Sequence, residues 1–322
     1  MKFLVKHWYS PQAPLLWLPV SWLFLFLVAI RRGLYKACIL PSQRLPVPVI
    51  VVGNINVGGT GKTPMVAWLV NLLKQQGYRP GVITRGYGGQ AKHWPQQVHP
   101  DSDPFIVGDE PVLLAQRCAC PVAAAPDRVA AAKSLLQYSN CNIVVADDGL
   151  QHYRLRRDIE VVVVDGERRF GNGQCLPAGP LREPVSRLKS VDFVIANGLA
   201  KQGEFAMTLV PGELVAVHDM QTKMGLDVLE SKRVHAVAGI GNPARFFELL
   251  KKHGLDVIEH AFPDHYQFDA SDIGFDDELP VLMTEKDAVK CRRFARENTW
   301  YLPVEAQLGE NFTYRFLQQL KN

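Results

Sequence analysis

The segment VVGNINVGGTGKTP, residues 51–64, constrains the fold more than any other part of the chain. A run of Val and Ile enters a glycine-rich turn, and an apolar helical pattern begins directly after Lys62 and Thr63. Phosphate oxygens need close approach to the backbone, free N–H groups and a helix N-terminus, and a glycine turn between a strand and a helix supplies all three. The pattern therefore predicts a nucleotide phosphate loop, with the lysine on the β- and γ-phosphates and the threonine hydroxyl on Mg²⁺.

One position departs from the usual motif. The pattern GxxxxGK[ST] has a glycine six residues before the lysine, and this chain has Asn56 there. The GGTGKT core and its place between a strand and a helix outweigh that difference. We expect the nucleotide phosphates to be contacted by Asn56, Gly58, Gly59, Thr60, Gly61, Lys62 and Thr63.

Short apolar runs that end in polar residues or glycine recur after the phosphate loop. They lie at residues 120–125, 142–149, 159–166 and 191–198, with connections of helical pattern among them. Strands of this kind joined by helices are typical of a parallel sheet covered on both faces. The sequence thus predicts an α/β fold with a P-loop-type parallel sheet sandwiched by helices.

A second, smaller α/β unit is expected near the C-terminus. From Arg233 onward, VHAVAGIG predicts a strand, NPARFFELLKKHG a helix and LDVIEHAF another strand. We therefore expect four parts. They are an apolar membrane-associated segment at 1–32, the phosphate-loop core at 33–215, a linker at 216–232 and a small C-terminal domain at 233–322.

The apolar segment APLLWLPVSWLFLFLVAI, residues 13–30, has no charged side chain, and Arg31 and Arg32 follow it directly. A cleaved signal peptide needs small residues before its cleavage site rather than two arginines. A membrane-spanning helix needs about 20 apolar residues, and this segment is shorter and contains two prolines. Trp17, Trp22 and the flanking cations favour a helix in the membrane interface. The pattern predicts membrane contact but does not decide between a helix that spans the membrane and one that lies in its interface.

Charge and cysteine usage exclude other classes of protein. Lys and Arg number 36 against 32 Asp and Glu, which leaves a net charge of +4, and the basic residues are scattered. A duplex-binding domain would concentrate them in a stripe, so nucleic acid is not an expected partner. The six cysteines are irregularly spaced and form no CxxC pair, which indicates reduced thiols.

Two acidic pairs are candidates for chemistry. In IVVADDGLQH, residues 143–152, a buried strand delivers Asp147 and Asp148 to its carboxyl end, as a Walker B strand does to support the Mg²⁺ shell. In VGDEP, residues 107–111, adjacent carboxylates at a loop end include a candidate base for a hydroxyl proton, although solvated acidic turns share this pattern.

Two further motifs say less when taken alone. FPDHYQF contains His265 between aromatic residues, and a lone histidine is more often structural than functional. TEKD, residues 284–287, resembles the guanine-reading NKxD, but its lysine directly precedes Asp287, so GTP specificity is not indicated.

Taken together, the motifs resemble those of the tetraacyldisaccharide 4′-kinase family of lipid A biosynthesis. The resemblance rests on GNINVGGTGKTP, TRGYGG, VGDEP, DDGLQH, LPAGPLREP, FPDHYQF and MTEKDAVK, which occur in this order between residues 53 and 290. It implies transfer of the γ-phosphoryl group of ATP to the 4′-hydroxyl of a tetraacylated glucosamine disaccharide 1-phosphate, giving lipid IV(A). It also implies work at the cytoplasmic face of the bacterial inner membrane, with no obligate protein partner evident.

The same resemblance assigns roles to residues of this chain. Asp109 matches the general base and His265 the histidine that pairs with it, so His265 becomes a catalytic candidate beside Lys62. The metal candidates are Thr63, Glu110, Asp147 and Asp148. His152 and Arg182 lie in matching motifs and are weaker candidates for substrate contact.

Two other functions remain open at this point. A soluble P-loop ATPase or GTPase of the metallochaperone or biotin-synthesis type would explain the phosphate loop and the acidic pair, but not the apolar N-terminal segment. A membrane-anchored nucleotide sensor would bind nucleotide without forming a phosphorylated lipid.

Overall fold

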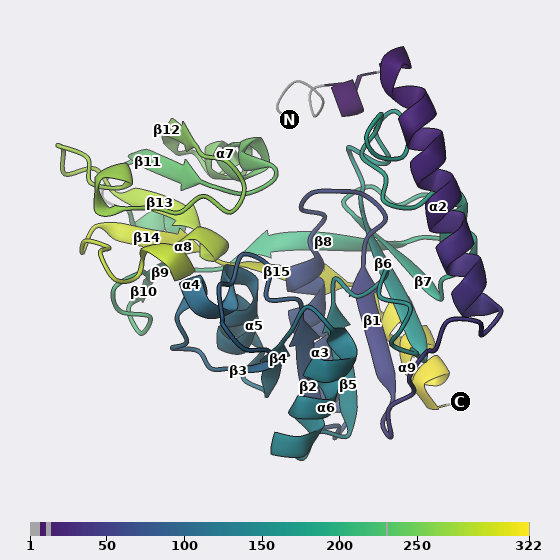
Figure 1. Ribbon diagram of the computed structural model, residues 1–322. Helices are drawn as coiled ribbons and strands as arrows, with labels where there is room; N and C mark the ends of the chain where they lie inside the picture. Colours follow the sequence, from purple (N-terminus) through teal and green to yellow (C-terminus); the bar gives the residue numbers. More distant parts are fainter. Residues whose placement is uncertain (1–6, 11–13, 230, 322) are drawn as a thin grey trace.

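Two β-sheets organise the chain, in a computed structural model that describes residues 7–10, 14–229 and 231–321 (Figure 1). Within those residues the first sheet has nine strands. In spatial order they are β15 (Val304–Leu308), β8 (Phe205–Pro211), β7 (Phe193–Asn197), β6 (Ile159–Asp165), β1 (Val49–Gly53), β5 (Ile143–Asp147), β2 (Pro80–Thr84), β4 (Val122–Ala124) and β3 (Gln96–Val98).

The first sheet is parallel except at its two ends, where β3 and β15 pair antiparallel to their neighbours. Alternate residues of β1 enter different cores, because successive side chains of a strand point to opposite faces. Ile50 joins the cluster beneath one set of helices and Val51 the cluster on the other face. The helices over the first cluster are α3 (Lys62–Gln75), α5 (Asp109–Cys118) and α9 (Glu310–Lys321), and those over the second are α6 (Arg128–Tyr138) and α2 (Leu18–Lys36).

Parallel pairing sets the geometry of the site. Val52 of β1 lies opposite Asp147 of β5, so the phosphate loop and the acidic pair leave the sheet side by side. This follows because the carboxyl ends of adjacent parallel strands meet at one edge of a sheet. The expected P-loop-type parallel sheet between helices is confirmed. Short connecting elements lie around this body: α4 (Pro104–Val107), η1 (Leu15–Trp17) and η2 (Val185–Ser190).

The second sheet builds a smaller domain with six strands among the described residues. In spatial order they are β10 (Lys223–Met224), β9 (Leu214–Ala216), β14 (Thr299–Leu302), β13 (Val281–Thr284), β11 (Arg233–Ala238) and β12 (Asp256–Ala261). Its helices are α7 (Pro243–Lys252) and α8 (Glu285–Cys291), with the short turns η3 (Leu226–Val228) and η4 (Ala270–Asp272). The four strands β11 to β14 are parallel to one another, as expected for an α/β unit.

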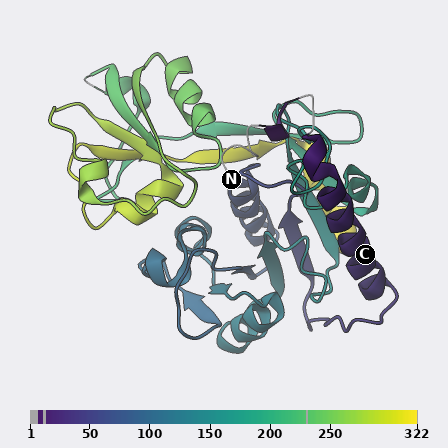
Figure 2. The same ribbon diagram turned by 45° about the horizontal axis from the view of Figure 1, so that its top comes forward.

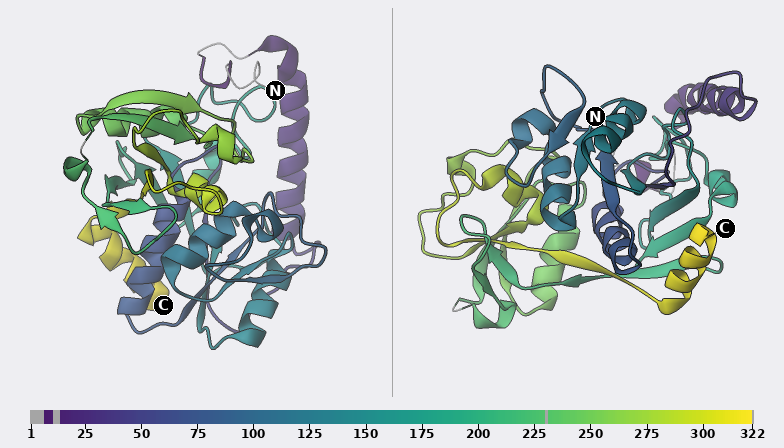
Figure 3. Two further views of the ribbon diagram at one scale, coloured as in Figure 1. Left: turned by 90° about the vertical axis from the view of Figure 1, so that its left-hand side faces the viewer. Right: turned by 90° about the horizontal axis from the view of Figure 1, so that it is seen from below.

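The chain crosses between the domains twice, which differs from the division at 216–232 and 233–322 expected from sequence. Strand β8 leads out of the core and β15 leads back beside it, antiparallel (Figure 3). Helix α9 then packs Phe312 and Phe316 into the core on the face of α3. A sequence pattern cannot show this return, because the residues of a strand or an amphipathic helix do not indicate which of two sheets the element joins. We propose domain bounds of 33–211 with 304–321 for the core, and 214–302 for the smaller domain.

Helix α2 lies along the core domain on the side remote from the second sheet (Figure 2). Its buried Ser21 donates a hydrogen bond to the Cys175 carbonyl at 2.7 Å, and Phe24 and Leu25 pack against the core. Its opposite face exposes Leu23, Phe26 and other large apolar side chains. The helix expected near the N-terminus is therefore present and docked by one face only. Ala13, the first residue of the apolar run, lies outside the described residues.

Candidate active site

The phosphate loop joins β1 to α3 and is held open by two asparagines. Asn54 Nδ2 donates to the Gly58 carbonyl at 3.2 Å, and Asn197 Nδ2, from the end of β7, donates to the Thr60 carbonyl at 3.0 Å. Gly61, the residue directly before helix α3, has a φ of 97°, a left-handed conformation that glycine adopts without strain. A side chain at Gly58 or Gly59 would meet nothing within 4 Å, so the loop faces open space with its backbone. This is the cradle that a nucleotide phosphate requires.

Two cations converge on one carboxylate beside this loop. Lys62 Nζ lies 3.5 Å from Asp148 Oδ1, and Arg182 donates to Asp148 Oδ2 at 3.1 Å. Burial alone would raise the pKa of Asp148, but the charges of Lys62 and Arg182 outweigh it and hold that pKa far below its usual range. Both cations are therefore held beside the loop, where the negative charge of a nucleotide phosphate would lie. Arg182, a weak candidate for substrate contact, belongs to the phosphate side of the site.

Asp147 has the surroundings expected of a metal ligand. It is buried at the end of β5, and its Oδ1 finds no hydrogen-bond donor among the described residues. Burial, reinforced by the negative charge of Glu110, raises the pKa of Asp147 to about 7. An unpartnered buried carboxylate oxygen near a second carboxylate fits a divalent cation, since Mg²⁺ prefers such oxygen ligands.

The donor set is small without the nucleotide. In the described part of the chain no three His, Cys, Asp or Glu side chains come close enough to hold an ion together. Mg²⁺ in kinases is commonly bound by one or two carboxylates together with phosphate oxygens and water. The residues present therefore fit a cation that arrives with the nucleotide.

The raised pKa of Asp147 predicts a pH-dependent stability. An acid whose pKa is higher in the folded than in the unfolded chain stabilises the fold below its unfolded pKa of about 3.9, and this contribution is lost as pH rises through about 7. Asp147→Asn should thus stabilise the nucleotide-free protein at pH 8 by up to about 4 kcal/mol, and little at pH 4. Thermal melts of wild type and variant across this range measure the difference. A gap that stays constant with pH would assign the stabilisation to another cause.

A second constellation forms where the smaller domain meets α5. Asp109, buried in the first turn of α5, lies with Oδ2 3.2 Å from His265 Nδ1. The Tyr87 ring packs 4.7 Å from the His265 ring, centroid to centroid. Burial alone would raise the pKa of Asp109, but the hydrogen bond with His265 and the charge of Lys286 outweigh it, so that pKa is lowered. Asp109 is consequently a carboxylate at neutral pH and can accept a proton.

His265 has a φ of 59°, a conformation that costs a non-glycine residue about 1–3 kcal/mol. Such strain persists where the surrounding structure fixes the residue, often at functional sites. A cavity of about 290 Å³ opens beside the pair and is bordered by Asp109, His265, Gly88 and Phe105. The pair is therefore reachable by a ligand.

The smaller domain also covers the phosphate loop. A side chain at Gly241 would place its Cβ 3.2 Å from the Gly59 nitrogen, so the two segments approach closely here. Arg245, in the first turn of α7, donates to Asn197 Oδ1 at 2.9 Å, and Asn197 in turn holds the loop. The structure thus brings both domains together around one site.

Other predicted residues lie at varying distances from this centre. Thr63 lies in the first turn of α3 beside Lys62, and Thr60 is buried within the loop. Asn56 is buried and donates to the Arg169 carbonyl at 2.9 Å, so its side chain holds the loop to a neighbouring turn. His152 Nε2 lies 3.3 Å from Asp127 Oδ1, and burial lowers the pKa of His152.

Sequence reasoning missed two cations that the fold brings in. Arg128, buried at the start of α6, donates to the Asp148 carbonyl at 3.2 Å. Lys286, from the TEKD motif, contacts Glu110 Oε1 at 3.1 Å. Lys286 lies in MTEKDAVK, one of the motifs that carry the family resemblance, but the sequence assigns it no role.

Comparisons with known proteins point to one family. The family model described as tetraacyldisaccharide-1-P 4′-kinase matches residues 13–321. A tetraacyldisaccharide 4′-kinase from Nitrosococcus oceani is 53% identical over 320 residues, covering 99% of this chain and 94% of that protein. One from Methylobacillus flagellatus is 52% identical over 322 residues, covering 99% of this chain and 96% of that protein.

A solved structure is similar in three dimensions as well. The crystal structure of LpxK from Aquifex aeolicus in complex with ATP superposes with a TM-score of 0.80 at 29% sequence identity. The match covers 94% of this chain and 98% of that one. The fold is thus shared, over nearly the whole chain, with a protein crystallised in complex with ATP.

Proposed function

The chain belongs to the tetraacyldisaccharide 4′-kinase family, and we propose that it transfers the γ-phosphoryl group of ATP to the 4′-hydroxyl of a tetraacylated glucosamine disaccharide 1-phosphate. One observation carries the proposal beyond the family match. The carboxylate of Asp109, paired with His265 across the domain boundary, borders a ligand-sized cavity, and the domain that supplies His265 also approaches the phosphate loop at Gly241. In this arrangement a proton acceptor, Asp109, lies where the lipid hydroxyl would bind, and cations lie where the nucleotide phosphates would bind.

The chemistry follows from these positions. The acceptor oxygen forms a bond to the γ-phosphorus, the bond from that phosphorus to the β–γ bridging oxygen breaks, and ADP leaves. The hydroxyl proton passes to Asp109, because a sugar hydroxyl does not ionise at pH 7 and its proton is released as the new bond forms. Phosphoryl transfer needs mainly alignment and charge stabilisation, which Lys62 and Arg182 provide near the phosphates.

Mg²⁺ would be held by Asp147 with Glu110, Asp148 and the Thr63 hydroxyl as further candidates, and it would neutralise phosphate charge. The unpartnered Asp147 oxygen and the raised pKa of its carboxyl support this assignment. The protein's part is to present these oxygens at the edge of the sheet next to the loop.

The decisive experiment supplies purified protein with MgATP and the tetraacylated disaccharide 1-phosphate. We expect one phosphate to be added to the lipid, at the 4′-position, with one ADP formed for each product. ATP hydrolysis without a phosphorylated lipid would favour the ATPase alternative, and nucleotide binding without either reaction would favour a sensor.

We further propose that α2 lies in the surface of the inner membrane on its cytoplasmic side rather than spanning it. Together, η1 and α2 form a helical segment, Leu15–Lys36, that is long and apolar enough to cross a membrane. Only 6% of its most apolar stretch of 18 residues is buried. A spanning helix would have to leave the protein, whereas α2 is attached to it through Ser21, Phe24 and Leu25 and, nearer its end, through Arg32. One face is therefore free for lipid while the other holds the kinase close to the bilayer.

The flanking arginines contact protein rather than standing free. Arg32 donates to the Ser190 hydroxyl at 2.7 Å, and the Arg31 guanidinium lies 5.8 Å from the centre of the Tyr153 ring. The apolar face, more than these charges, should therefore determine membrane binding.

Charging that face should release the protein from membranes. Leu23 and Phe26 are 58% and 60% exposed, so Leu23→Lys with Phe26→Lys should leave the fold intact. Loss of two apolar contacts should lower binding to inner-membrane-like vesicles at least about tenfold, measured by flotation. Val228→Lys, at a residue 64% exposed in the smaller domain, is the matched control. Equal flotation of all three proteins would contradict the interfacial position of α2.

A further inference from the structure

Two consecutive carboxylates of α5 are each met by a side chain of the smaller domain. His265 Nδ1 contacts Asp109 Oδ2 at 3.2 Å, and Lys286 Nζ contacts Glu110 Oε1 at 3.1 Å. The two contacts run side by side across the domain boundary. Among the described residues, the hydrogen-bond partners of Lys286 are outside the phosphate loop and the acidic pair of β5.

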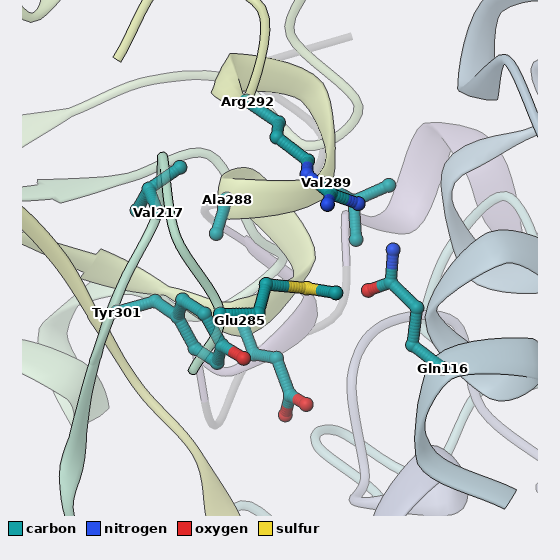
Figure 4. A pocket seen from close by; sticks show the side chains of 8 residues that line it. Gln116, Val217, Glu285, Ala288, Val289, Arg292 and Tyr301 are labelled. Atoms are coloured by element: carbon teal, nitrogen blue, oxygen red, sulfur yellow. The ribbon is translucent and has the colours of Figure 1, made fainter. Parts of the chain in front are cut away.

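Lys286 is held in place by its own short helix. Helix α8 begins after Thr284, whose hydroxyl accepts the Asp287 amide, and buried Asp287 accepts the Gly239 amide at 2.9 Å. On the other side of α8, Glu285 pairs with Arg117 of α5 at 3.3 Å, and Glu285 and Gln116 of α5 line one small pocket (Figure 4). Successive residues of α8 therefore bridge to α5, which fixes the Lys286 side chain against the site.

The ammonium group of Lys286 has three acceptors around it. Besides Glu110 Oε1, it lies 3.3 Å from Asp264 Oδ1 and 3.4 Å from His265 Nε2. An ammonium group has three N–H donors and no acceptor. All three partners must therefore accept, which includes the Nε2 atom of His265.

This requirement fixes the protonation of the His265 ring. Nε2 must carry a lone pair, so the single ring proton of neutral His265 lies on Nδ1 and is donated to Asp109. The opposite tautomer would turn an N–H toward the ammonium group and a lone pair toward the carboxylate. A doubly protonated ring would place a second cation 3.4 Å from Lys286, closer than the Asp264 carboxylate oxygen that faces Nε2 at 3.8 Å. The Lys286 side chain, 16% exposed, is little screened by water.

We propose that Lys286 is a positioning residue that fixes His265 in the Nδ1-protonated tautomer and aligns it with Asp109. The inference rests on the proposed kinase function for its catalytic meaning, since Asp109 is the proton acceptor there. Its consequence is that Asp109 receives its hydrogen bond from a neutral, oriented imidazole. Asp109 Oδ1 accepts the Glu110 amide at 2.9 Å, so both carboxylate oxygens are fixed in direction. Lys286 thus acts through His265 and not on the substrate.

The tautomer can be measured directly. In protein labelled with ¹⁵N-histidine, two-bond ¹H–¹⁵N spectra distinguish a protonated from an unprotonated ring nitrogen, and His265→Gln identifies the His265 signals. For wild type without substrate at pH 7.5 we expect a protonated Nδ1 and an unprotonated Nε2. A wild-type ring protonated at Nε2 overturns the proposal without any Lys286 variant. Because no substrate is present, this result is independent of whether the chain phosphorylates the lipid.

The Lys286 variants then test the cause. In Lys286→Met the His265 signals should shift toward mixed tautomers or a doubly protonated ring, while Lys286→Arg, which keeps the donors, should retain the wild-type pattern. Turnover on the lipid should fall about 10- to 100-fold in Lys286→Met with MgATP affinity changed less than about threefold, and Lys286→Arg should recover most of it. Lys251→Met, on the exposed surface of α7, is the control for loss of a lysine. An unchanged His265 tautomer in Lys286→Met contradicts the proposal.

Discussion

Lys62→Ala should lower turnover by about 10³-fold while the protein stays folded. The Lys62 ammonium is the cation at the start of α3, where the β- and γ-phosphates of a bound nucleotide would lie. Charge developing on the transferred group is stabilised by such fixed cations, and losing one group of this kind costs about 10²–10³-fold in comparable sites. A P-loop lysine also contacts the nucleotide before transfer, so we place the effect at the upper end.

The fold should tolerate the change because Asp148 keeps a partner. Arg182 remains 3.1 Å from Asp148 Oδ2 when Lys62 is gone, so no buried charge is left unpaired. Circular dichroism and thermal melting report the fold, and lipid phosphorylation reports turnover. Lys74→Ala is the matched control, since Lys74 lies at the far end of the same helix and donates to the Cys118 carbonyl. Near-normal turnover of Lys62→Ala would refute the phosphate-loop assignment.

Much of the core could be predicted because local sequence determines it. The run of Val and Ile in β1, the glycine turn and the first residues of α3 form one local unit, and its geometry is required by the residues themselves. The acidic pair was predictable for the same reason, since β5 ends at Asp147. Register then brings β1 and β5 together.

What could not be predicted depends on long-range contacts. His265 is 156 residues from Asp109, and no periodicity indicates that they meet. Only the family resemblance paired them. Lys286 was missed because a single lysine has many possible partners, and its actual partners depend on where the fold places α8. The return of β15 to the core was missed for a similar reason. The docked face of α2 was also undecidable, because an apolar run with residues such as Phe24 does not show which side will meet protein.

Asp109→Asn should reduce turnover by about 10²–10⁴-fold and change MgATP affinity less than about threefold. Asparagine keeps the size of the side chain and still accepts a hydrogen bond from His265, but its amide does not accept the hydroxyl proton. A base acts in the transition state, so its loss appears in the rate of transfer rather than in nucleotide binding. Single-turnover phosphorylation of the lipid and direct MgATP titration separate the two. Asp101→Asn, in the exposed turn before α4, is the control for loss of one carboxylate.

A double substitution tests whether Asp109 and His265 act as one unit. If His265 serves only by orienting Asp109, then His265→Gln should cost little once Asp109→Asn is present, and the two losses should not multiply. Multiplying losses would mean that His265 acts on the substrate separately. If Asp109→Asn instead weakened MgATP binding and left turnover intact, Asp109 would belong with Glu110 and Asp147 among the metal candidates. The base role and the metal role also correspond to different places in the structure. Asp109 contacts the smaller domain through His265, whereas Asp147 is buried on the core side at the end of β5.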